Sequence, residues 1–349
     1  MKVIIPCCGS SSRFPDLPPK WMLPDHAGRP MIREAVSKIP VSASDIIVVI
    51  LQEHEDRFQA VRGLKLAFGP EVQVVILGER TRSQSETVMK ALEATGLDEP
   101  FLVKDSDNCF RVDVPNQAEN YVCYDSLNNH SLINPRNKSY LQLNAQGSIL
   151  NIKEKMVISD TFSVGGYYFT DPALFRQVYD KLSGRFLGED RELYLSDVIS
   201  SMILEGVHFR GLPVSDYQDW GTVHDWKRFL LSRKTYLVSL DGYLFERGSE
   251  YFDPTFEAVR PHASAVEAVK KLRTEGHSVI LLSIRSSQLT AMTKDQLAAI
   301  GFEDIPVVFD CPIARWEMVT APYRGIPFRT SEAYELSPDA SDAFDLLNQ

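Results

Sequence analysis

The chain has 349 residues with a formal net charge of −10, and 44% of its residues are hydrophobic, so its length suits two globular domains. An acidic balance argues against bulk nucleic-acid binding, although a few local basic groups can still hold an anionic substrate. No apolar run reaches the roughly 18 to 20 residues that cross a bilayer, and the five scattered cysteines lack a Cys-x-x-Cys pair, so we expect a cytoplasmic protein with free thiols and no membrane partner.

The first half of the chain alternates strand and helix patterns, which predicts a mainly parallel sheet covered by helices. Runs rich in Val, Ile and Leu suit strands buried on both faces, and they cover residues 3–5, 45–52, 72–78 and 101–103. Two helices are predicted between these strands. Their apolar stripes are Ile32, Ala35, Val36 and Ile39, and then Val88, Ala91 and Leu92.

The pattern changes between about residues 111 and 170. Residues 140–143 and 149–152 flank a turn and predict a hairpin, and residues 162–169 predict another strand. We therefore expect an antiparallel or mixed region beside the parallel half, where a substrate pocket could form.

A helix is predicted over about residues 222–232, and a new α/β pattern follows it. This pattern contains a strand at 236–240, a helix at 262–274 that Gly276 ends, and a strand at 279–283. We place the boundary near Leu231, which gives domains 1–231 and 232–349. The boundary has no Gly/Ser/Pro linker, so we expect the two domains to dock against each other.

A loop of small residues follows the first strand. Small side chains let backbone N–H groups approach phosphate oxygens, and serine hydroxyls add donors. Arg13 offers a fixed charged fork, and Lys20 adds a point charge on a proline-stiffened segment. The loop residues that could contact phosphate are Pro6, Cys8, Gly9, Ser10, Ser11 and Ser12. An ordinary strand-to-helix loop with solvated charges explains this segment alone about equally well.

Two carboxylates, Asp105 and Asp107, follow the strand at 101–103. The carboxyl edge of an open α/β sheet is where ligands bind, and Mg²⁺ prefers a few protein carboxylates completed by phosphate and water. A turn that ends a strand is the ordinary alternative. A third carboxylate, Asp219, lies in the segment DYQDWGTVHDW, where it could instead belong to the start of a helix.

These segments resemble the sugar-nucleotidyltransferase family. Its signature is a hydrophobic strand, Ala-Ala-Gly-x-Gly-x-Arg-Phe, Pro-Lys-x-Leu-x-Pro and Gly-x-Pro-Met-Ile. The matching residues are Gly9, Arg13, Phe14, Pro19, Lys20, Leu23, Pro24, Gly28, Pro30, Met31 and Ile32. Two departures are Cys7-Cys8 in place of the alanine pair and Ser11 in place of the second glycine, which leaves the loop geometry open.

The resemblance implies roles for the candidate residues. The loop would hold a triphosphate that Arg13 and Lys20 neutralise, and Asp107 and Asp219 would hold one Mg²⁺, with Asp105 beside them. Tyr217, Gly221 and Thr222 also match the family motif around Asp219, with Tyr217 in the aromatic place.

Weaker correspondences extend this set of roles. Lys155 would bind the phosphate of an acceptor, with Glu154 facing the acceptor and Gly165 or Gly166 leaving room for it. The segment 81–92 lies where the family has a Gly-Thr-Ala helix start, and there Gln84 and Ser85 would contact base or ribose.

The implied activity is transfer of NMP from an NTP to a small phosphorylated acceptor such as a sugar 1-phosphate, with release of pyrophosphate. The acceptor's phosphate is already ionised, so orientation and charge neutralisation would supply most of the catalysis. Analogy with small-acceptor cytidylyltransferases favours CTP. The identity of the acceptor stays open, and so does assembly into a homodimer.

Residues 236–349 resemble a small haloacid-dehalogenase-type (HAD) phosphatase domain, on the segments YLVSLDGYLF and GHSVILLS. In that family Asp-x-Asp-Gly-Thr supplies the nucleophile and then the acid/base. Here Ser239 stands at the nucleophile position, Asp241 at the acid/base position, and Ser283 matches the phosphate-binding residue. Serine is a much weaker nucleophile than a carboxylate, and no acidic pair follows near 307–319, so we expect an inactive HAD-like domain.

Two alternatives remain for the whole chain. It could be bifunctional, with an active phosphatase beside the nucleotidyltransferase, and release of phosphate from an aryl phosphate would favour this. It could also be a non-catalytic, nucleotide-binding regulatory protein, which tight NTP binding without pyrophosphate release would favour.

Overall fold

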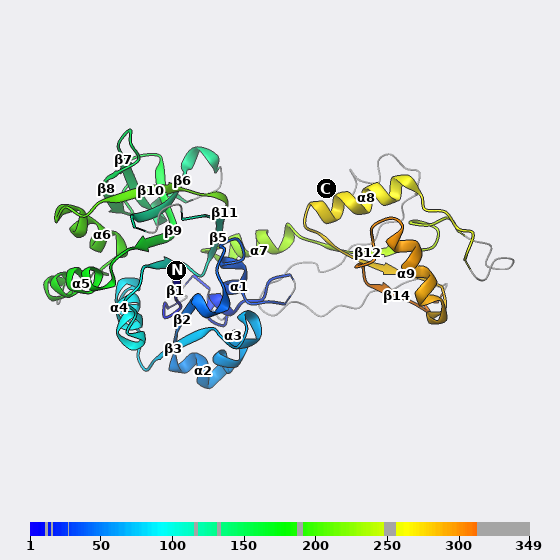
Figure 1. Ribbon diagram of the computed structural model, residues 1–349, viewed down its shortest axis with the longest axis horizontal. Coiled ribbons are helices and arrows are strands. Elements are labelled where there is room, and N and C mark those ends of the chain that lie inside the picture. Colours follow the sequence, from blue (N-terminus) through cyan, green and yellow to red (C-terminus); the bar gives the residue numbers. More distant parts are fainter. Residues whose placement is uncertain are drawn as a thin grey trace. The chain divides into compact units, whose positions relative to one another are not determined.

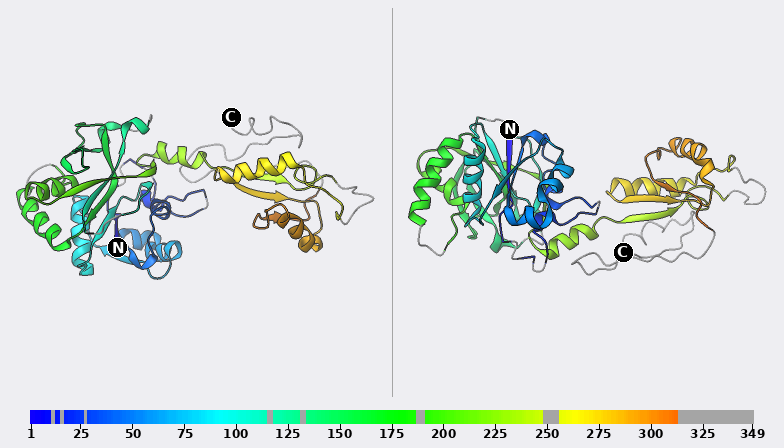
Figure 2. Two further views of the ribbon diagram at one scale, coloured as in Figure 1. Left: turned by 45° about the horizontal axis from the view of Figure 1, so that its top comes forward. Right: turned by 90° about the horizontal axis from the view of Figure 1, so that it is seen from below.

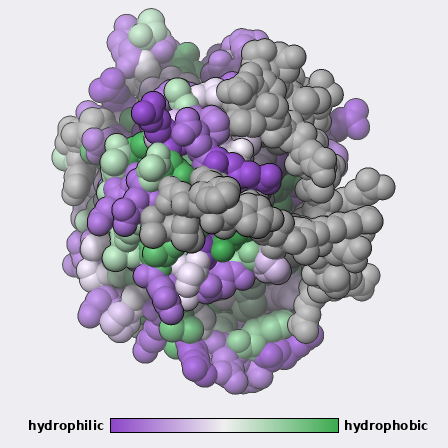
Figure 3. All heavy atoms as spheres, turned by 90° about the vertical axis from the view of Figure 1, so that its right-hand side faces the viewer, coloured by the Kyte–Doolittle hydropathy of each residue, from purple (hydrophilic) through white to green (hydrophobic). Residues whose placement is uncertain are grey.

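The computed structural model describes residues 1–10, 13–14, 17–26, 28–114, 118–130, 134–186, 191–247 and 256–312 (Figure 1). The chain divides into two compact units, Met1–Trp226 and Lys227–Gln349. The first unit ends shortly before the boundary that the sequence suggested near Leu231. None of the helices in the described ranges combines the length and the apolar character needed to cross a bilayer. Hydrophilic and apolar side chains are interspersed on the coloured part of the face in Figure 3.

The first unit is built on a mixed sheet that runs β10-β6-β9-β4-β1-β2-β3, with a hairpin of β7 and β8 beside β9. Its strands are β1 (Lys2–Pro6), β2 (Ile46–Leu51), β3 (Gln73–Leu77), β4 (Phe101–Lys104), β6 (Asn120–Ser126), β7 (Ser139–Leu143), β8 (Ile149–Glu154), β9 (Thr161–Phe169) and β10 (Phe209–Pro213). A separate two-stranded ladder joins β5 (Asn108–Arg111) and β11 (Ser215–Asp219). The predicted α/β class with a mixed sheet is confirmed for this unit.

The strand order changes direction between β1 and β4. Strands β3, β2, β1 and β4 are parallel, and β9 pairs antiparallel with β4. From β1 the chain first builds β2 and β3 on one side and then returns to add β4 on the other side. Loops that leave the carboxyl ends of two such strands diverge, and this is where open α/β sheets bind ligands.

Helices cover both faces of the sheet (Figure 2). On one face α4, α5 and α6 pack their apolar side chains against β1, β4 and β8, and on the other face α1 and α3 do so against β1 and β2. The helices of this unit are α1 (Met31–Ala35), α2 (Gln52–Phe58), α3 (Ala60–Phe68), α4 (Gln84–Thr95), α5 (Pro172–Phe186) and α6 (Leu195–Leu204), with 3₁₀ turns η1 (Lys20–Met22), η2 (Ala43–Asp45), η3 (Leu127–Asn129) and η4 (Pro135–Asn137). Helix α7 (Val223–Leu231) follows β11 and confirms the helix predicted over 222–232.

Both helices predicted between the parallel strands are present as α1 and α4, but α1 is shorter than predicted. Helix α4 begins after Ser83, whose hydroxyl accepts a hydrogen bond from Glu86 N at 3.2 Å, and ends at Gly96 with φ +62°. Helix α1 is shorter than the apolar stripe suggested, because the chain leaves the helix at Val36 in tight turns that lead to Pro40. The residue before a proline is disfavoured in a helix, so the stripe continues in turns that still bury Ile39.

The second unit contains a three-stranded parallel sheet in the order β12-β13-β14, within the described residues. Its elements are β12 (Thr235–Ser239), α8 (Ala263–Thr274), β13 (Ser278–Leu282), η5 (Ser287–Leu289), α9 (Thr290–Ala298) and β14 (Val307–Val308). Apolar side chains from the strands and helices, among them Leu240, Val269 and Leu281, form its core. The predicted strands and helix of this region are confirmed.

Candidate active site at the carboxyl ends of β1 and β4

Asp107 lies in the turn that follows β4 and carries an ion pair. The Nζ atom of Lys20 is 2.5 Å from its Oδ2 atom, and the two side chains are 23% and 13% exposed. Burial by itself would raise the pKa of Asp107, but Lys20, Arg13 and Lys138 outweigh it and hold the pKa well below its usual range. Asp107 is therefore an anion at every pH at which the protein would work.

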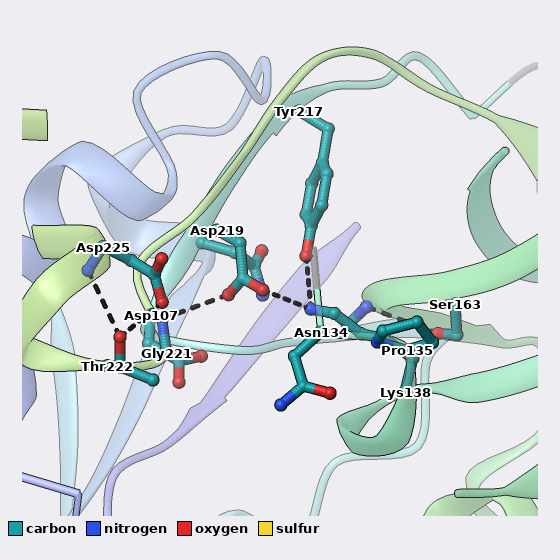
Figure 4. Close-up of polar contacts among 12 residues, drawn as sticks. Asp107, Asn134, Pro135, Lys138, Ser163, Tyr217, Asp219, Gly221, Thr222 and Asp225 are labelled. Atoms are coloured by element: carbon teal, nitrogen blue, oxygen red, sulfur yellow. Dashed lines mark hydrogen bonds and ion pairs between the residues drawn. The ribbon is translucent and has the colours of Figure 1, made fainter. Parts of the chain in front are cut away.

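The pairing of β5 with β11 brings Asp219 close to Asp107. In this antiparallel ladder Asp219 pairs with Asn108, and the peptide N–H of Trp220 donates to the Asp107 carbonyl at 2.8 Å. Gly221 marks where the side chains meet (Figure 4). A Cβ atom placed on Gly221 would lie 3.1 Å from Asp219 Oδ1, 3.3 Å from Arg13 Nη1 and 3.8 Å from Asp107 Oδ2. Two carboxylates and a guanidinium from distant parts of the chain thus surround one point.

Lys138, between η4 and β7, is a site residue that the sequence analysis missed. Its Nζ donates to Asp219 Oδ2 at 2.6 Å and to the Tyr217 hydroxyl at 2.8 Å (Figure 4). The ammonium also lies 5.8 Å from the centre of the Phe162 ring and 5.4 Å from that of Tyr217. The side chain is only 13% exposed. The local sequence around Lys138 is polar and gives no signal, because its place depends on the pairing of β7 with β8 and β9.

The two carboxylates are candidate ligands for a divalent cation. Among the described residues there is no group of three or more His, Cys, Asp or Glu side chains that could hold a metal ion. Mg²⁺ does not require one, because it commonly takes one or two carboxylates and completes its shell with phosphate oxygens and water. Asp107 and Asp219 therefore fit a Mg²⁺ ion that arrives with a phosphate ligand better than one bound by protein groups alone.

Asp105, at the start of the same turn, has different surroundings. Its carboxylate accepts a hydrogen bond from Gln84 Nε2 at the start of α4, and its peptide N–H donates to the Gly165 carbonyl at 2.9 Å. Burial and the negative charge of Asp107 raise the pKa of Asp105 to about 6. Two neighbouring carboxyl groups thus titrate in separate ranges, and Asp107 carries the permanent charge.

Replacing Asp105 with Asn should change how stability depends on pH. The folded protein binds the Asp105 proton more tightly than the unfolded chain does. Its protonation therefore stabilises the fold fully below pH about 4, and this contribution is lost as the pH rises through about 6. Between these values we expect the free energy of unfolding to fall by about 2 kcal/mol more in the wild type than in Asp105→Asn. Urea unfolding in EDTA, followed by tryptophan fluorescence, measures this, and equal pH dependence in both proteins would contradict it.

Lys104, the last residue of β4, holds the turn in place and was also missed. Its Nζ donates to the carbonyl of Asp105 at 2.7 Å, to the carbonyl of Asn108 at 2.8 Å and to Asn108 Oδ1 at 2.5 Å. The side chain is completely buried, and this burial lowers the pKa of Lys104 to about 8. Its three acceptors join both ends of the turn that contains Asp105 and Asp107.

The loop after β1 turns from the core to the surface. Cys7 N–H and the Cys8 thiol both donate to the Val49 carbonyl, at 2.8 Å and 3.6 Å. The two thiols are buried on opposite faces of the sheet, which explains how cysteines can stand where the resembled family has small alanines. Gly9 and Ser10 are exposed, as a loop that offers backbone N–H groups to a ligand requires. Ser11 and Ser12 lie outside the described residues, and Pro6 is the last residue of β1.

Two predicted ligand contacts point into the protein instead. Ser85 is completely buried, and its hydroxyl donates to the Leu193 carbonyl at 2.5 Å, so it does not face a base or ribose. A Cβ atom on Gly166 would lie 2.7 Å from Phe110 Cζ and 2.9 Å from Cys123 Cβ. The space that this glycine leaves is therefore filled by core side chains and not available to an acceptor. Gly165, on the other face of β9, is the glycine that borders the site.

The Glu154-Lys155 pair lies at the end of β8. Glu154 accepts hydrogen bonds from the hydroxyls of Ser139 and Ser196. Lys155 is exposed, and its Nζ donates to the Tyr194 hydroxyl at 2.8 Å, which raises the pKa of Lys155. The structure thus directs Lys155 toward Tyr194, whereas Lys138 binds Asp219.

No protein-family model matches the chain, and no curated protein matches it in sequence. Solved structures match its fold. A nucleoside-diphosphate-sugar pyrophosphorylase from Vibrio cholerae has a TM-score of 0.57 and 20% identity, covering 66% of this chain and 99% of that one. An inositol-1-phosphate CTP transferase from T. maritima has a TM-score of 0.51 and 16% identity, covering 65% and 94%. A UDP-glucose pyrophosphorylase complexed with UDP-glucose has a TM-score of 0.50 and 16% identity, covering 66% and 97%. The chain therefore shares their fold over about two-thirds of its length.

Proposed function

We propose that the first unit is a Mg²⁺-dependent nucleotidyltransferase that moves NMP from an NTP to a small phosphorylated acceptor, such as a sugar 1-phosphate, and releases pyrophosphate. The observation that carries this proposal is the meeting of Asp107, Asp219 and Arg13 around one point at the carboxyl edge of the sheet, with Lys20 bound to Asp107. The three solved structures that share this fold are named as two sugar-nucleotide pyrophosphorylases and an inositol-1-phosphate CTP transferase, and they support the same class of reaction.

Different residues of the site would have different roles in such a reaction. Arg13 and Lys20 would bind the phosphates of the NTP and offset their charge, and the loop after β1 would donate backbone N–H groups. A phosphate oxygen of the acceptor attacks the α-phosphorus, a new P–O bond forms, and the bond to the β-phosphate oxygen breaks as pyrophosphate leaves. Mg²⁺ held by Asp107 and Asp219 would supply further neutralisation of the phosphate charge. Of the two residues that the resemblance gives to the acceptor, Glu154 keeps that proposed role, whereas Lys155 is exposed and bonded to the Tyr194 hydroxyl, so we propose no acceptor contact for it.

CTP is the proposed donor nucleotide. The support is the analogy with small-acceptor cytidylyltransferases and the shared fold with a CTP transferase. Gln84 lies at the start of α4 and bonds Asp105 at the edge of the site. Gln84 and Ser85 were both predicted to contact the base or ribose. Because Ser85 is buried, Gln84 is the one that we propose for this contact.

Pyrophosphate release tests the function directly. The full chain is incubated with MgCl₂, with each of the four common NTPs and with a panel of sugar 1-phosphates and other small phosphomonoesters. We expect release with at least one acceptor, fastest with CTP and abolished by EDTA. Thermal shift with each NTP ranks the nucleotides independently, because a ligand of the native state raises Tm. No release with any pair, despite a shift with an NTP, would favour a non-catalytic nucleotide-binding protein instead.

For the second unit we propose an inactive HAD-like domain. Asp241, at the acid/base position, is buried and bound to Arg285 Nε at 2.7 Å and to the Ser283 hydroxyl at 2.7 Å. Arg285 is itself completely buried between Phe245 and Phe256. Both oxygens of Asp241 are thus taken by protein partners, and Ser239 offers no carboxylate to act as a nucleophile. Phosphate release from an aryl phosphate by the full chain would contradict this proposal.

A further inference from the structure

Cationic side chains reach the carboxylate pair from two different parts of the chain. Arg13 and Lys20 belong to the segment after β1, whereas Lys138 immediately precedes β7 and belongs to the hairpin side of the unit. In an in-line transfer the attacking group and the leaving group lie on opposite sides of the phosphorus. Cations supplied by two separate segments match the charges of two phosphorylated substrates, one of which leaves while the other attacks.

We propose that Lys138 binds the phosphate group of the acceptor, and this inference rests on the proposed function. Arg13 and Lys20 account for the NTP side, and Lys138 is the cation that reaches Asp219 from the hairpin. Its ammonium is fixed by three contacts, to Asp219, to the Tyr217 hydroxyl and over the Phe162 ring. A lysine held in this way loses little conformational freedom when a phosphate arrives. Little of the free energy of binding is therefore spent on ordering the side chain.

The ion pairs of the site provide a reason for Lys138 to bind a phosphate. Asp219 is the partner of Lys138, and Asp107 is the partner of Lys20. A divalent cation held by Asp107 and Asp219 would compete with Lys20 and Lys138 for these carboxylates, and a partly buried ammonium whose carboxylate is shared in this way is better stabilised by a further anion. Phosphate oxygens are the anions that arrive at the same time, so each lysine gains a phosphate beside its carboxylate.

Lys155 is the competing candidate for the same role. The peptide N–H of Lys155 donates to the Lys138 carbonyl at 2.9 Å, so the two residues are neighbours in the backbone. Their side chains differ, because Lys155 has φ +55°, is exposed and points its ammonium to Tyr194. An exposed ammonium interacts with a phosphate through water and is screened by salt, whereas Lys138 is 13% exposed beside the candidate metal ligands.

The test compares Lys138→Met with the matched variant Lys155→Met in the full chain. We expect Lys138→Met to raise the KM for the acceptor by about 10- to 100-fold, which is the typical value of a charge-assisted hydrogen bond, with the KM for CTP changed less than about threefold. Lys155→Met should change both constants by less than about threefold. Lys138→Arg keeps the charge, and it should recover most of the affinity and show that the loss does not reflect misfolding.

Binding of inorganic phosphate provides a second measurement that needs no turnover. Phosphate is titrated calorimetrically into the protein saturated with Mg²⁺ and a non-hydrolysable CTP analogue. We expect binding by the wild type, Lys155→Met and Lys138→Arg, and a loss of about 10-fold or more in Lys138→Met. Equal binding by the wild type and Lys138→Met would overturn the inference even if pyrophosphate release is normal. Absence of pyrophosphate release from the wild type would overturn the function instead, and the titration would still decide the role of Lys138.

Discussion

Replacing Asp107 with Asn should lower the kcat/KM for pyrophosphate release by about 10²- to 10³-fold or more, the effect of removing one electrostatic partner of a reacting phosphate. Asn has the same shape but lacks the charge that pairs with Lys20 at 2.5 Å and offers a hard ligand to Mg²⁺. The loss should appear with every NTP and acceptor, because it does not depend on the base. Initial rates with saturating MgCl₂ measure it.

Asp216→Asn is the matched control for this variant. Asp216 lies in β11, only three residues before Asp219, but it is half exposed and forms surface ion pairs with Lys38 and Arg111. Such pairs contribute about 0 to 1 kcal/mol, and Asn tolerates the positive φ of this position. We expect activity within about twofold of the wild type. Full activity in Asp107→Asn would show that the site is wrongly placed.

Gly165→Ala should lower the free energy of unfolding by about 4 kcal/mol, one of the largest stability effects expected in the first unit. Gly165 has φ +79°, and an added Cβ would lie 2.2 Å from Asp105 Oδ2 and 2.9 Å from Asn108 Nδ2. Neither neighbour can withdraw freely, because Asp105 is bound to Gln84 and Asn108 to Lys104. The methyl group would therefore displace the turn that carries both carboxylates, and activity should fall with stability. Urea unfolding measures the change.

Gly147→Ala separates the two causes of this loss. Gly147 also has φ +79°, but its nearest neighbour for an added Cβ is a side-chain nitrogen of Arg210 at 4.0 Å. Its replacement should therefore cost only the strain of the backbone conformation, about 1 kcal/mol. An equal cost at the two positions would mean that the contact with Asp105 is unimportant.

The parallel half of the fold could be predicted because of where its strands lie. Strands β1, β2 and β4 are buried on both faces, so they read as continuous Val, Ile and Leu runs. Helices α2 and α3 were not predicted. Helix α2 begins directly at the end of β2 and buries little besides His54, so it shows no apolar stripe. Helix α3 does carry an apolar stripe, Ala60, Leu64 and Phe68, but it is short and contains Gly63, which lowers its intrinsic helix propensity.

The sequence was sufficient to predict the two carboxylates of the site and the cations Arg13 and Lys20. It did not predict Lys138 or Lys104. Asp107 and Asp219 were chosen because each follows an apolar or motif-like segment, and the structure brings them together, while their role as metal ligands stays a prediction. Lys138 and Lys104 acquire their places through strand pairing and burial, which no local pattern records. The prediction that Ser85 and Gly166 face a ligand was wrong for the same reason. A helix or strand position shows its face only once the neighbouring elements are known.

The ladder between β5 and β11 also has a consequence for biosynthesis. Domains tend to fold from the N-terminus while the ribosome is still at work, and here the parallel strands and the turn after β4 are available early. Asp219 emerges more than a hundred residues after Asp107, and its ladder with β5 can close only then. A nascent or prematurely terminated chain that lacks β11 would lack Asp219 and the Trp220 N–H that donates to the Asp107 carbonyl. Asp107 and Asp219 can therefore come together only after β11 has been synthesised.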